Sequence, residues 1–393
     1  MINLAMVHIT IKNNTTVDFE IKSDRICACV KKILLEEEID SLEVICDDVG
    51  YKTPNFTTSG LYCLHGTAKL ANNENTSWSV IVKVIKPDSA EKNFAEHHNY
   101  WRREALVFNS GILNELPDSI KVARCFWVEE LPDKTIWIWM EHIQGKHADT
   151  VEHFSFIAGQ LGRFNAAYLT GVKTLPKYDW LCSAWLKSWT TASRLYAPHV
   201  DTYVEGLSDD HYRTIWAWYQ NLIRKLDFAI ESLQRLPRVL AHQDLSQKNM
   251  FLTARDNSTS QLVLIDWQFL SISGIGEDLG KLFGVNMSLG IIQPNQYDEF
   301  QRSLYTSYLE GLRSAGWQGD ERLMRYGFYL SMALRSVWEV PQYFSLLAQL
   351  DADPQNDNLK DQLYRLERIL MIQKNMYSEV ELLMPELGFC TLQ

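Results

Sequence analysis

Three polar residues follow a short apolar run in a spacing that could support catalysis. His242 comes first, Asp244 stands two residues later, and Asn249 stands five residues after that. A second apolar run, Leu262–Ile265, ends on Asp266, which lies 22 residues beyond Asp244. One carboxylate could take the proton of an attacking hydroxyl, while an amide oxygen and a second carboxylate are the kinds of ligand that Mg²⁺ prefers. The residue types therefore indicate phosphoryl transfer.

Two short strands and the loop between them must position these residues. Polar groups at strand ends converge well because the rigid strands hold both ends of a short loop. The order H-x-D-x4-N, followed by a strand that ends on Asp266, is the layout of a kinase catalytic loop and its metal-binding Asp.

A lysine further upstream could serve the phosphates of a nucleotide. Lys83 stands inside the apolar stretch Trp78–Ile85. A buried Lys needs a partner, whereas on an edge strand it could point to solvent, and the strand alone leaves both interpretations open. The next element is predicted to be a helix over Glu91–Ser110 and offers the partner. Glu104 is the expected one, with Glu96 about two turns earlier as the alternative.

Taken together, these motifs resemble the aminoglycoside phosphotransferase and choline kinase-like superfamily, which shares the protein-kinase fold. The matching stretches are Trp78–Ile85, Trp101–Gly111, Ile136–Glu141, Leu161–Ala166, His242–Asn249, Leu262–Gln268 and Gly276–Leu279. The resemblance runs from about residue 42 to the end of the chain. It implies an α+β, bilobal protein-kinase-like fold, with an N-lobe of antiparallel sheet plus helix and a large, mainly helical C-lobe.

The expected domain organisation follows from that fold. Residues 1–41 form an N-terminal cap or extension, 42–141 the N-lobe with its nucleotide-binding sheet and helix, 142–150 the hinge, and 151–393 the C-lobe with the catalytic loop, metal site and acceptor-binding region. Within the C-lobe, long helices are predicted over His211–Leu236 and Glu321–Gln349, the second kinked or divided at Pro341.

The resemblance implies a set of nucleotide-binding residues. Lys83, oriented by Glu104, would hold the α- and β-phosphates of ATP. Ser59 would line the phosphate loop, and Glu141 and Ile143 would contact the nucleotide near the hinge.

It also implies a catalytic and a metal-binding set. Asp244 would be the catalytic residue that takes or orients the proton of the acceptor hydroxyl. Asn249 and Asp266 would bind Mg²⁺, typically two ions, while His242 and Asp278 would support the loop.

Several departures from the protein-kinase pattern favour a small acceptor. Trp267–Gln268 follows the metal-binding Asp in place of Phe–Gly, and Ser246 stands where protein kinases usually carry a Lys. The loop Tyr51–Ser59 is not glycine-rich, and the path from Asp266 to Asp278 is too short for an activation segment. We therefore expect a hydroxyl of a small molecule as acceptor, such as an aminoglycoside-like antibiotic, an amino alcohol or a related metabolite.

Two alternatives stay open at this point. One is a peptide Ser/Thr kinase that tailors a ribosomally made natural product, and the other is a pseudokinase that only binds. The complete set of Lys83, Asp244, Asn249 and Asp266 argues against the second.

The acceptor contacts are the least defined part of the predicted site. The segment Arg335–Glu339 interrupts an apolar helix with charge and is the first place to look. The chosen candidates are Glu277, Arg335, Trp338 and Glu339, and the wider set adds Asp209, Asp210, Trp216 and Trp218.

Composition limits the remaining classes of partner. The net charge of −11 disfavours nucleic acid as a partner, and it is compatible with a cationic acceptor. No apolar run approaches the ~18–20 residues of a membrane span, and the start lacks a signal-peptide pattern. The 7 cysteines, with no C-x2-C pair, are typical of ordinary thiols in a reducing compartment. A cytoplasmic location is expected.

Overall fold

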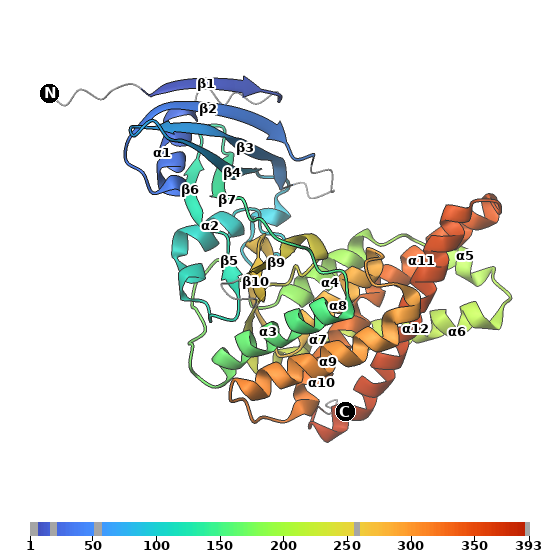
Figure 1. Cartoon of the computed structure of the whole chain (residues 1–393). Coiled ribbons are helices and arrows are strands. Elements are labelled where there is room, and N and C mark those ends of the chain that lie inside the picture. Colours follow the sequence, from blue (N-terminus) through green and yellow to red (C-terminus); the bar gives the residue numbers. More distant parts are fainter. Residues whose placement is uncertain (1–6, 16–21, 51–56, 255–259, 390–393) are drawn as a thin grey trace. The chain divides into compact units, whose positions relative to one another are not determined.

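The computed structural model describes residues 7–15, 22–50, 57–254 and 260–389. Contacts within the chain divide it into two units, and Figure 1 labels their elements. Unit 1 comprises Met1–Phe94, Tyr100–Asn114 and Val122–Gln144, and unit 2 comprises Ala95–Asn99, Glu115–Lys121 and Gly145–Gln393. Most of the expected phosphate loop, residues 51–56, lies outside the described residues.

Unit 1 is built on a six-stranded sheet in the described ranges. Its strands, in spatial order, are β1 (His8–Asn13), β2 (Ile39–Asp48), β3 (Thr58–Leu70), β4 (Asn75–Ile85), β7 (Ile136–Glu141) and β6 (Cys125–Glu130). Neighbouring strands run antiparallel, except that β1 pairs with β2 in parallel. The antiparallel N-lobe sheet is thus confirmed, with one parallel strand added at its edge.

Two helices use opposite faces of this sheet. Alternation along β7 sends Trp137 and Trp139 into a cluster with α1 (Ser23–Leu34), whereas Ile138 packs in a second cluster with Ala105 of α2 (Arg103–Ser110). β4 follows the same rule, because Val80, Val82 and Val84 belong to the first cluster and Ile81 and Ile85 to the second. Lys83 shares the parity of the second set, so it lies on the face that carries α2.

The helix predicted over Glu91–Ser110 is much shorter in the structure. Only α2 and the short η2 (Glu91–Asn93) are helical there, and η3 (Ile112–Glu115) and β5 (Lys121–Val122) follow. The intervening residues have partners elsewhere within unit 2. The backbone N–H of His98 donates to Ser188 Oγ (2.9 Å), and the Glu96 carbonyl accepts from Cys182 Sγ (3.4 Å). Backbone groups used in this way cannot join a helical ladder.

Unit 2 is mainly helical, with two small sheets among the helices (Figure 1). Its helices are α3 (Val151–Leu169), α4 (Trp185–Tyr196), α5 (Asp201–Glu205), α6 (Asp210–Arg224), α7 (Leu226–Gln234), α8 (Glu277–Ser288), η6 (Pro294–Gln296), α9 (Tyr297–Ser314), α10 (Glu321–Leu334), α11 (Ser336–Ala352) and α12 (Asp357–Glu386). Strands β8 (Arg238–Ala241) and β11 (Ser271–Gly274) pair antiparallel, as do β9 (Met250–Ala254) and β10 (Ser260–Leu264). No helix of the described residues is both long and apolar enough to cross a membrane.

Two predicted helices are divided in the structure, one that was expected to be continuous and one that was expected to be kinked or divided at Pro341. The helix over His211–Leu236 breaks at Lys225, between α6 and α7. The helix over Glu321–Gln349 breaks at Arg335, and Pro341 lies inside α11. A proline clashes with the carbonyl of the residue four positions earlier, so its disturbance falls on the N-terminal side of the ring. The division expected at Pro341 was therefore placed too late in the chain.

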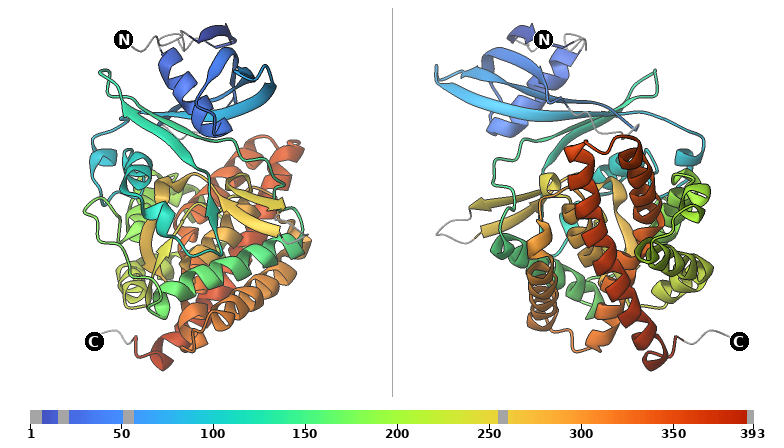
Figure 2. Two further views of the ribbon diagram at one scale, coloured as in Figure 1. Left: turned by 60° about the vertical axis from the view of Figure 1, so that its left-hand side comes forward. Right: turned by 90° about the vertical axis from the view of Figure 1, so that its right-hand side faces the viewer.

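Helices α3 and α9 lie side by side and form the base of unit 2 (Figure 2). Glycines permit this close approach, since a Cβ on Gly162 would stand 2.2 Å from the Tyr308 carbonyl oxygen. A Cβ on Gly311 would likewise stand 2.2 Å from the Gly159 oxygen. This tight pair carries Asn165, which donates to the Leu240 carbonyl of β8, and Tyr308, which donates to Asn165.

Candidate active site

The predicted catalytic loop lies entirely within unit 2, between paired strands. His242 follows β8 directly, and Asp266 stands two residues after the end of β10. Gln243 and Asp266 adopt left-handed backbone conformations, with φ of 60° and 62°. Non-glycine residues rarely take such angles, and where they do the surrounding structure must hold them there. The two chain reversals that shape this loop are therefore enforced by tertiary contacts.

Asp278 supplies one of those contacts. It lies in the first turn of α8 and is buried. Its Oδ2 accepts the backbone N–H of His242 at 2.9 Å, and its Oδ1 accepts that of Gln243 at 2.8 Å. Burial raises the pKa of Asp278 to about 6, although both hydrogen bonds act to lower it. One carboxylate thus fixes the backbone immediately before Asp244.

His242 connects the loop to the strand that carries Asp266. Its Nε2 lies 3.1 Å from the Ile265 carbonyl oxygen, and its Nδ1 accepts the backbone N–H of Asp244 at 3.1 Å. A ring that donates through Nε2 and accepts through Nδ1 is neutral. Burial agrees with this assignment, because it lowers the pKa of His242 to about 4. The ring also packs edge-on against Trp267, with centroids 4.5 Å apart.

Asn249 and Asp266 offer oxygens suited to a divalent cation. The Asn249 side-chain amide donates to the Asp244 carbonyl at 3.1 Å, which directs its nitrogen into the loop and leaves its Oδ1 for another partner. An amide and a carboxylate oxygen fit Mg²⁺, which completes its shell with water and phosphate oxygens. In the described residues no cluster of three or more His, Cys, Asp or Glu side chains could hold a metal by itself. The role of Asn249 and Asp266 as metal ligands stays a prediction.

Sequence reasoning missed the polar residues that support the loop from other helices. Asn286 of α8 donates to the Leu245 carbonyl at 2.9 Å and accepts the backbone N–H of Gln247 at 2.9 Å. Asn165 of α3 donates to the Leu240 carbonyl at 3.0 Å and accepts from the Tyr308 hydroxyl at 2.5 Å. Both asparagines are fully buried. The available signal was an Asn in an otherwise apolar helical face, where a polar group needs a partner.

The phosphate-binding candidates lie in unit 1. Lys83 Nζ and Glu104 Oε2 form an ion pair of 2.6 Å, with side chains only 7% and 1% exposed. Glu96, the alternative partner, belongs to unit 2. β4 lies between β3 and β7, so the edge-strand interpretation of Lys83 does not apply. The pairing is as expected, and the role of the pair toward a nucleotide stays a prediction.

Three further nucleotide-binding candidates are also in unit 1. The Ser59 hydroxyl donates to the Val84 carbonyl at 3.2 Å. The Glu141 carboxylate accepts the backbone N–H of Arg124 at 3.0 Å, so it anchors the end of β7 to the residue that precedes β6. Ile143 is partly exposed two residues beyond β7. Their contacts with a nucleotide stay predictions.

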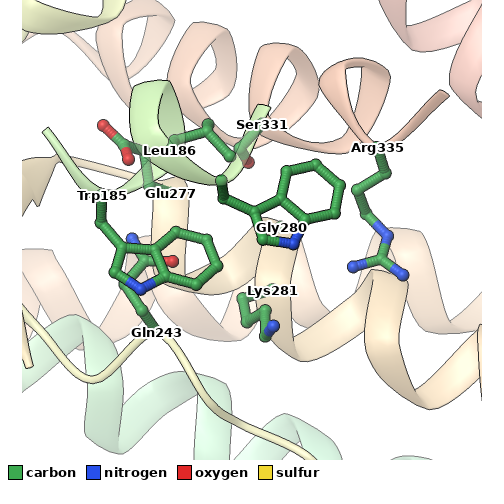
Figure 3. Close-up of a pocket in the computed structure, with 9 residues that line it drawn as sticks. Trp185, Leu186, Gln243, Glu277, Gly280, Lys281, Ser331 and Arg335 are labelled. Atoms are coloured by element: carbon green, nitrogen blue, oxygen red, sulfur yellow. The ribbon is translucent and has the colours of Figure 1, made fainter. Parts of the chain in front are cut away.

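A pocket adjoins the catalytic loop within unit 2, and Figure 3 shows its lining. We call it the Trp185 pocket. Between α4, α8, α10 and the loop residue Gln243, about 300 Å³ is not filled by protein atoms, open solvent at the mouth included, and only about 20 Å³ of it admits the centre of a water-sized sphere. Lys281 of α8 points into it, and burial lowers the pKa of this lysine to about 8. Among its charged neighbours, Asp244 has the largest effect on Lys281.

Only two of the four chosen acceptor candidates line this pocket. Glu277 and Arg335 line the Trp185 pocket, whereas Trp338 and Glu339 do not. Glu339 is buried and accepts from Arg335 at 2.7 Å, from Ser288 at 2.7 Å and from Gln373. An acceptor contact by Glu339 finds no support here, since its oxygens already hold three helices together. Lys281, which was not predicted, lines the pocket and interacts electrostatically with Asp244.

The comparison with curated proteins finds no match for this chain. A family model described as the phosphotransferase enzyme family matches residues 71–318, which is more than half of the chain. The chain belongs to the phosphotransferase enzyme family. The matched range includes Lys83, Glu104, Asp244, Asn249 and Asp266. The predicted enzyme class, a phosphotransferase, and the suspected superfamily are thereby confirmed.

Solved structures share the fold of this phosphotransferase. An amicoumacin kinase, solved with AMP-PNP, Ca²⁺ and its ligand, matches with a TM-score of 0.52 and 15% identity over 90% of this chain and 96% of that chain. Choline kinase from Cryptosporidium parvum Iowa II matches with a TM-score of 0.50 and 13% identity over 88% of this chain and 94% of that chain. At such low identity the likeness concerns the fold alone, and it confirms the predicted bilobal, protein-kinase-like α+β architecture.

Proposed function

We propose that this phosphotransferase moves the γ-phosphoryl group of ATP to a hydroxyl of a small molecule, with Mg²⁺ as cofactor. The observation that carries the proposal is the supported loop from His242 to Asn249. Asp278, His242 and Asn286 hold its backbone at successive positions. Phosphoryl transfer depends mainly on positioning and charge neutralisation, and such a rigid loop serves that purpose.

Within this proposal each residue has a distinct task. Asp244 orients the acceptor hydroxyl and takes its proton as the new P–O bond forms, while the bond from the γ-phosphorus to the bridging oxygen breaks and ADP leaves. Lys83, held by Glu104 at 2.6 Å, binds the α- and β-phosphates. His242 and Asp278 are positioning residues, because they act on Asp244 through the backbone.

Asn249 and Asp266 would hold Mg²⁺. The bound ion would neutralise charge on the phosphate oxygens. The Asn249 nitrogen donates to the Asp244 carbonyl, and its Oδ1 accepts no hydrogen bond from the residues that the structure describes, which supports this assignment. The AMP-PNP and Ca²⁺ named for the amicoumacin kinase agree with a nucleotide and a divalent cation.

The path after Asp266 supports a small acceptor over a peptide. η5 (Trp267–Phe269) and β11 occupy it, and β11 pairs with β8 before α8 begins at Glu277. This ordered path leaves no free segment on which a peptide substrate could dock as it does on a protein-kinase activation loop.

The direct test is transfer from Mg²⁺-ATP to an alcohol panel, followed by mass spectrometry. Asp244→Asn should lower acceptor-dependent turnover by at least ~10²-fold while Mg²⁺-ATP still raises the melting temperature, because the nucleotide contacts remain. Asp361→Asn, an exposed Asp in α12, is the matched control and should keep full activity. Full activity in Asp244→Asn would exclude the proposed mechanism, and phosphorylation of peptides alone would exclude the small acceptor.

A further inference from the structure

The Trp185 pocket has no carboxylate available for a cationic acceptor. Among its lining residues the only acid is Glu277. This side chain is buried, its Oε1 accepts the backbone N–H of Gly274 at 2.6 Å, and Arg238 lies 3.9 Å from it. Burial also raises the pKa of Glu277 to about 7, which weakens its charge at neutral pH. The nearby Glu339 carboxylate already accepts hydrogen bonds from Ser288, Arg335 and Gln373.

Hydrogen-bond donors, in contrast, are in excess around this pocket. In the described part of the chain, the Lys281 ammonium group makes no hydrogen bond or ion pair, and it contacts the Trp185 and Phe269 rings at 5.1 and 5.8 Å. The Trp185 indole Nε1 and the Arg335 Nε are buried and find no partner among the described residues. Figure 3 shows Trp185, Lys281 and Arg335 around the same space. Buried donors without partners are costly, so a ligand with acceptor oxygens would relieve them.

The wall of the pocket is flat and aromatic. The Trp185 and Trp189 rings of α4 lie nearly parallel, with centroids 6.3 Å apart and an interplanar angle of 9°. The Phe269 ring is tilted by 49° against Trp185, with centroids 5.4 Å apart. Such a wall favours contact with an apolar or aromatic face of a ligand.

From these observations we infer that the acceptor carries an anionic group, such as a carboxylate, on an apolar or aromatic body beside its hydroxyl. Lys281 binds the anionic group, the Trp185 and Arg335 donors complete its shell, and α4 covers the body. This inference rests on the proposed function, because it takes Asp244 as the residue that receives the acceptor hydroxyl. It departs from the cationic acceptor that the acidic net charge allowed.

Three matched alcohols test the inference: 4-(hydroxymethyl)benzoate, 4-(hydroxymethyl)benzamide and 4-(hydroxymethyl)benzylamine. They share ring and hydroxyl and differ in charge. Binding to the full chain is measured by ligand-observed NMR, with and without Mg²⁺-AMP-PNP. The benzoate should bind at least about tenfold more tightly than the benzamide, and the benzylamine most weakly. Equal affinities, tighter binding of the amine, or no binding of the benzoate at about 10 mM would overturn the inference.

Variants locate the effect in the pocket. Lys281→Gln should remove most of the preference for the benzoate, and Lys281→Arg should retain it, because the positive charge remains. Trp185→Phe keeps an aromatic wall but loses the Nε1 donor, so benzoate affinity should fall about threefold while benzamide affinity changes less. Lys177→Gln, at an exposed lysine outside the lining, is the control and should change nothing.

Two further outcomes separate this inference from the proposed function. If Lys281→Gln slows turnover of all three alcohols equally without changing their affinities, Lys281 acts on the transferred phosphate and the inference is wrong. If Mg²⁺-AMP-PNP gives no thermal stabilisation, the proposed function fails. A preference for the benzoate, measured without nucleotide, would still support an anion-binding pocket.

Discussion

At the scale of single residues, two neighbouring carboxylates in α8 have different tasks. Asp278 uses both oxygens to hold the backbone N–H groups of His242 and Gln243. Glu277 accepts one backbone N–H, that of Gly274, and lines the Trp185 pocket. Both are buried, and burial raises both pKa values. A conservative amide replacement should therefore have opposite consequences at the two positions.

Asp278→Asn should impair both folding and catalysis. The amide oxygen can accept only one of the two loop N–H groups, and the amide nitrogen would face the other donor. We expect a loss of about 2–3 kcal/mol in the free energy of unfolding and a fall in kcat of at least ~10-fold. Urea denaturation and steady-state kinetics measure the two effects. Unchanged kcat would contradict the positioning role of Asp278.

Glu277→Gln should change the pH dependence of stability. The pKa of Glu277 is about 7 in the folded chain, above the ordinary value of 4.5, so the folded state binds more protons and wild-type stability falls as pH rises between those values. The glutamine variant has no titrating group at this position, so it does not lose stability in this way as pH rises. Relative to wild type it should gain about 3 kcal/mol on going from pH 4.5 to pH 8.

Subtracting the two unfolding curves isolates Glu277 from other titrating groups. His242 has the opposite sign, because its folded pKa of about 4 lies below the ordinary 6.5, so stability rises with pH between those values. That contribution is common to both proteins and cancels. A difference between wild type and variant that does not depend on pH would refute the assignment.

At the scale of elements, the close pairing of α3 and α9 places two buried polar residues at β8, the strand that leads into the loop. Asn165 comes from α3 and Tyr308 from α9, and they bond to each other at 2.5 Å. Glycines on both helices allow the approach. The two glycines of α3 differ sharply in the space around them, which gives a matched pair of variants.

Gly162→Ala should destabilise the chain, and Gly159→Ala should not. A Cβ at Gly162 would lie 2.2 Å from the backbone carbonyl oxygen of Tyr308. At Gly159 the nearest atom, the Ser307 carbonyl oxygen, lies at an ordinary contact distance of 3.5 Å. We expect a loss of about 2 kcal/mol or more for the first variant and a gain of up to ~1 kcal/mol for the second, from helix propensity. Guanidinium denaturation followed by circular dichroism measures both. Equal effects would show that α9 moves to accommodate the added methyl group.

At the scale of the whole molecule, the proposed machinery is divided between two units. Unit 1 holds Lys83 and Glu104, while unit 2 holds Asp244, Asn249 and Asp266. The ion pair of unit 1 is almost fully buried. Buried pairs often contribute little net stability, so this one is better explained by function than by folding.

Removing one member of this pair should be far more damaging to stability than removing both. Lys83→Met leaves the Glu104 carboxylate buried without its cation, and we expect a loss of about 3–5 kcal/mol. The double variant Lys83→Met with Glu104→Leu should recover most of that loss and still lack stabilisation by Mg²⁺-ATP. Thermal melts with and without nucleotide measure both effects. Nucleotide stabilisation of the double variant would contradict the proposed role of Lys83.

The sequence predicted the fold class and the pairing of Lys83 with Glu104, because both depend on local patterns. Strand alternation, helix spacing and the order of the motifs can be read without knowing how the elements pack against one another. Helix ends were predicted less well. Residues 95–99 looked helical by pattern, yet their backbone groups bond to the region of α4, more than 80 positions away in the chain. Local propensity carries no information about such partners.

By itself, then, the sequence indicated the chemistry proposed for this phosphotransferase: Asp244, Asn249 and Asp266 span 22 positions, in an order and with side chains that suit phosphoryl transfer. Only the tertiary structure decided what surrounds that chemistry. Trp185, Lys281 and Arg335 come from three separate parts of the chain, and only folding places them around one pocket. The structure also showed that the Glu339 carboxylate accepts hydrogen bonds from neighbouring helices, whereas Lys281 interacts with Asp244 of the catalytic loop. The sequence shows which residues carry a carboxylate or an ammonium group, but it does not show whether a neighbour in the fold forms a hydrogen bond or an ion pair with that group.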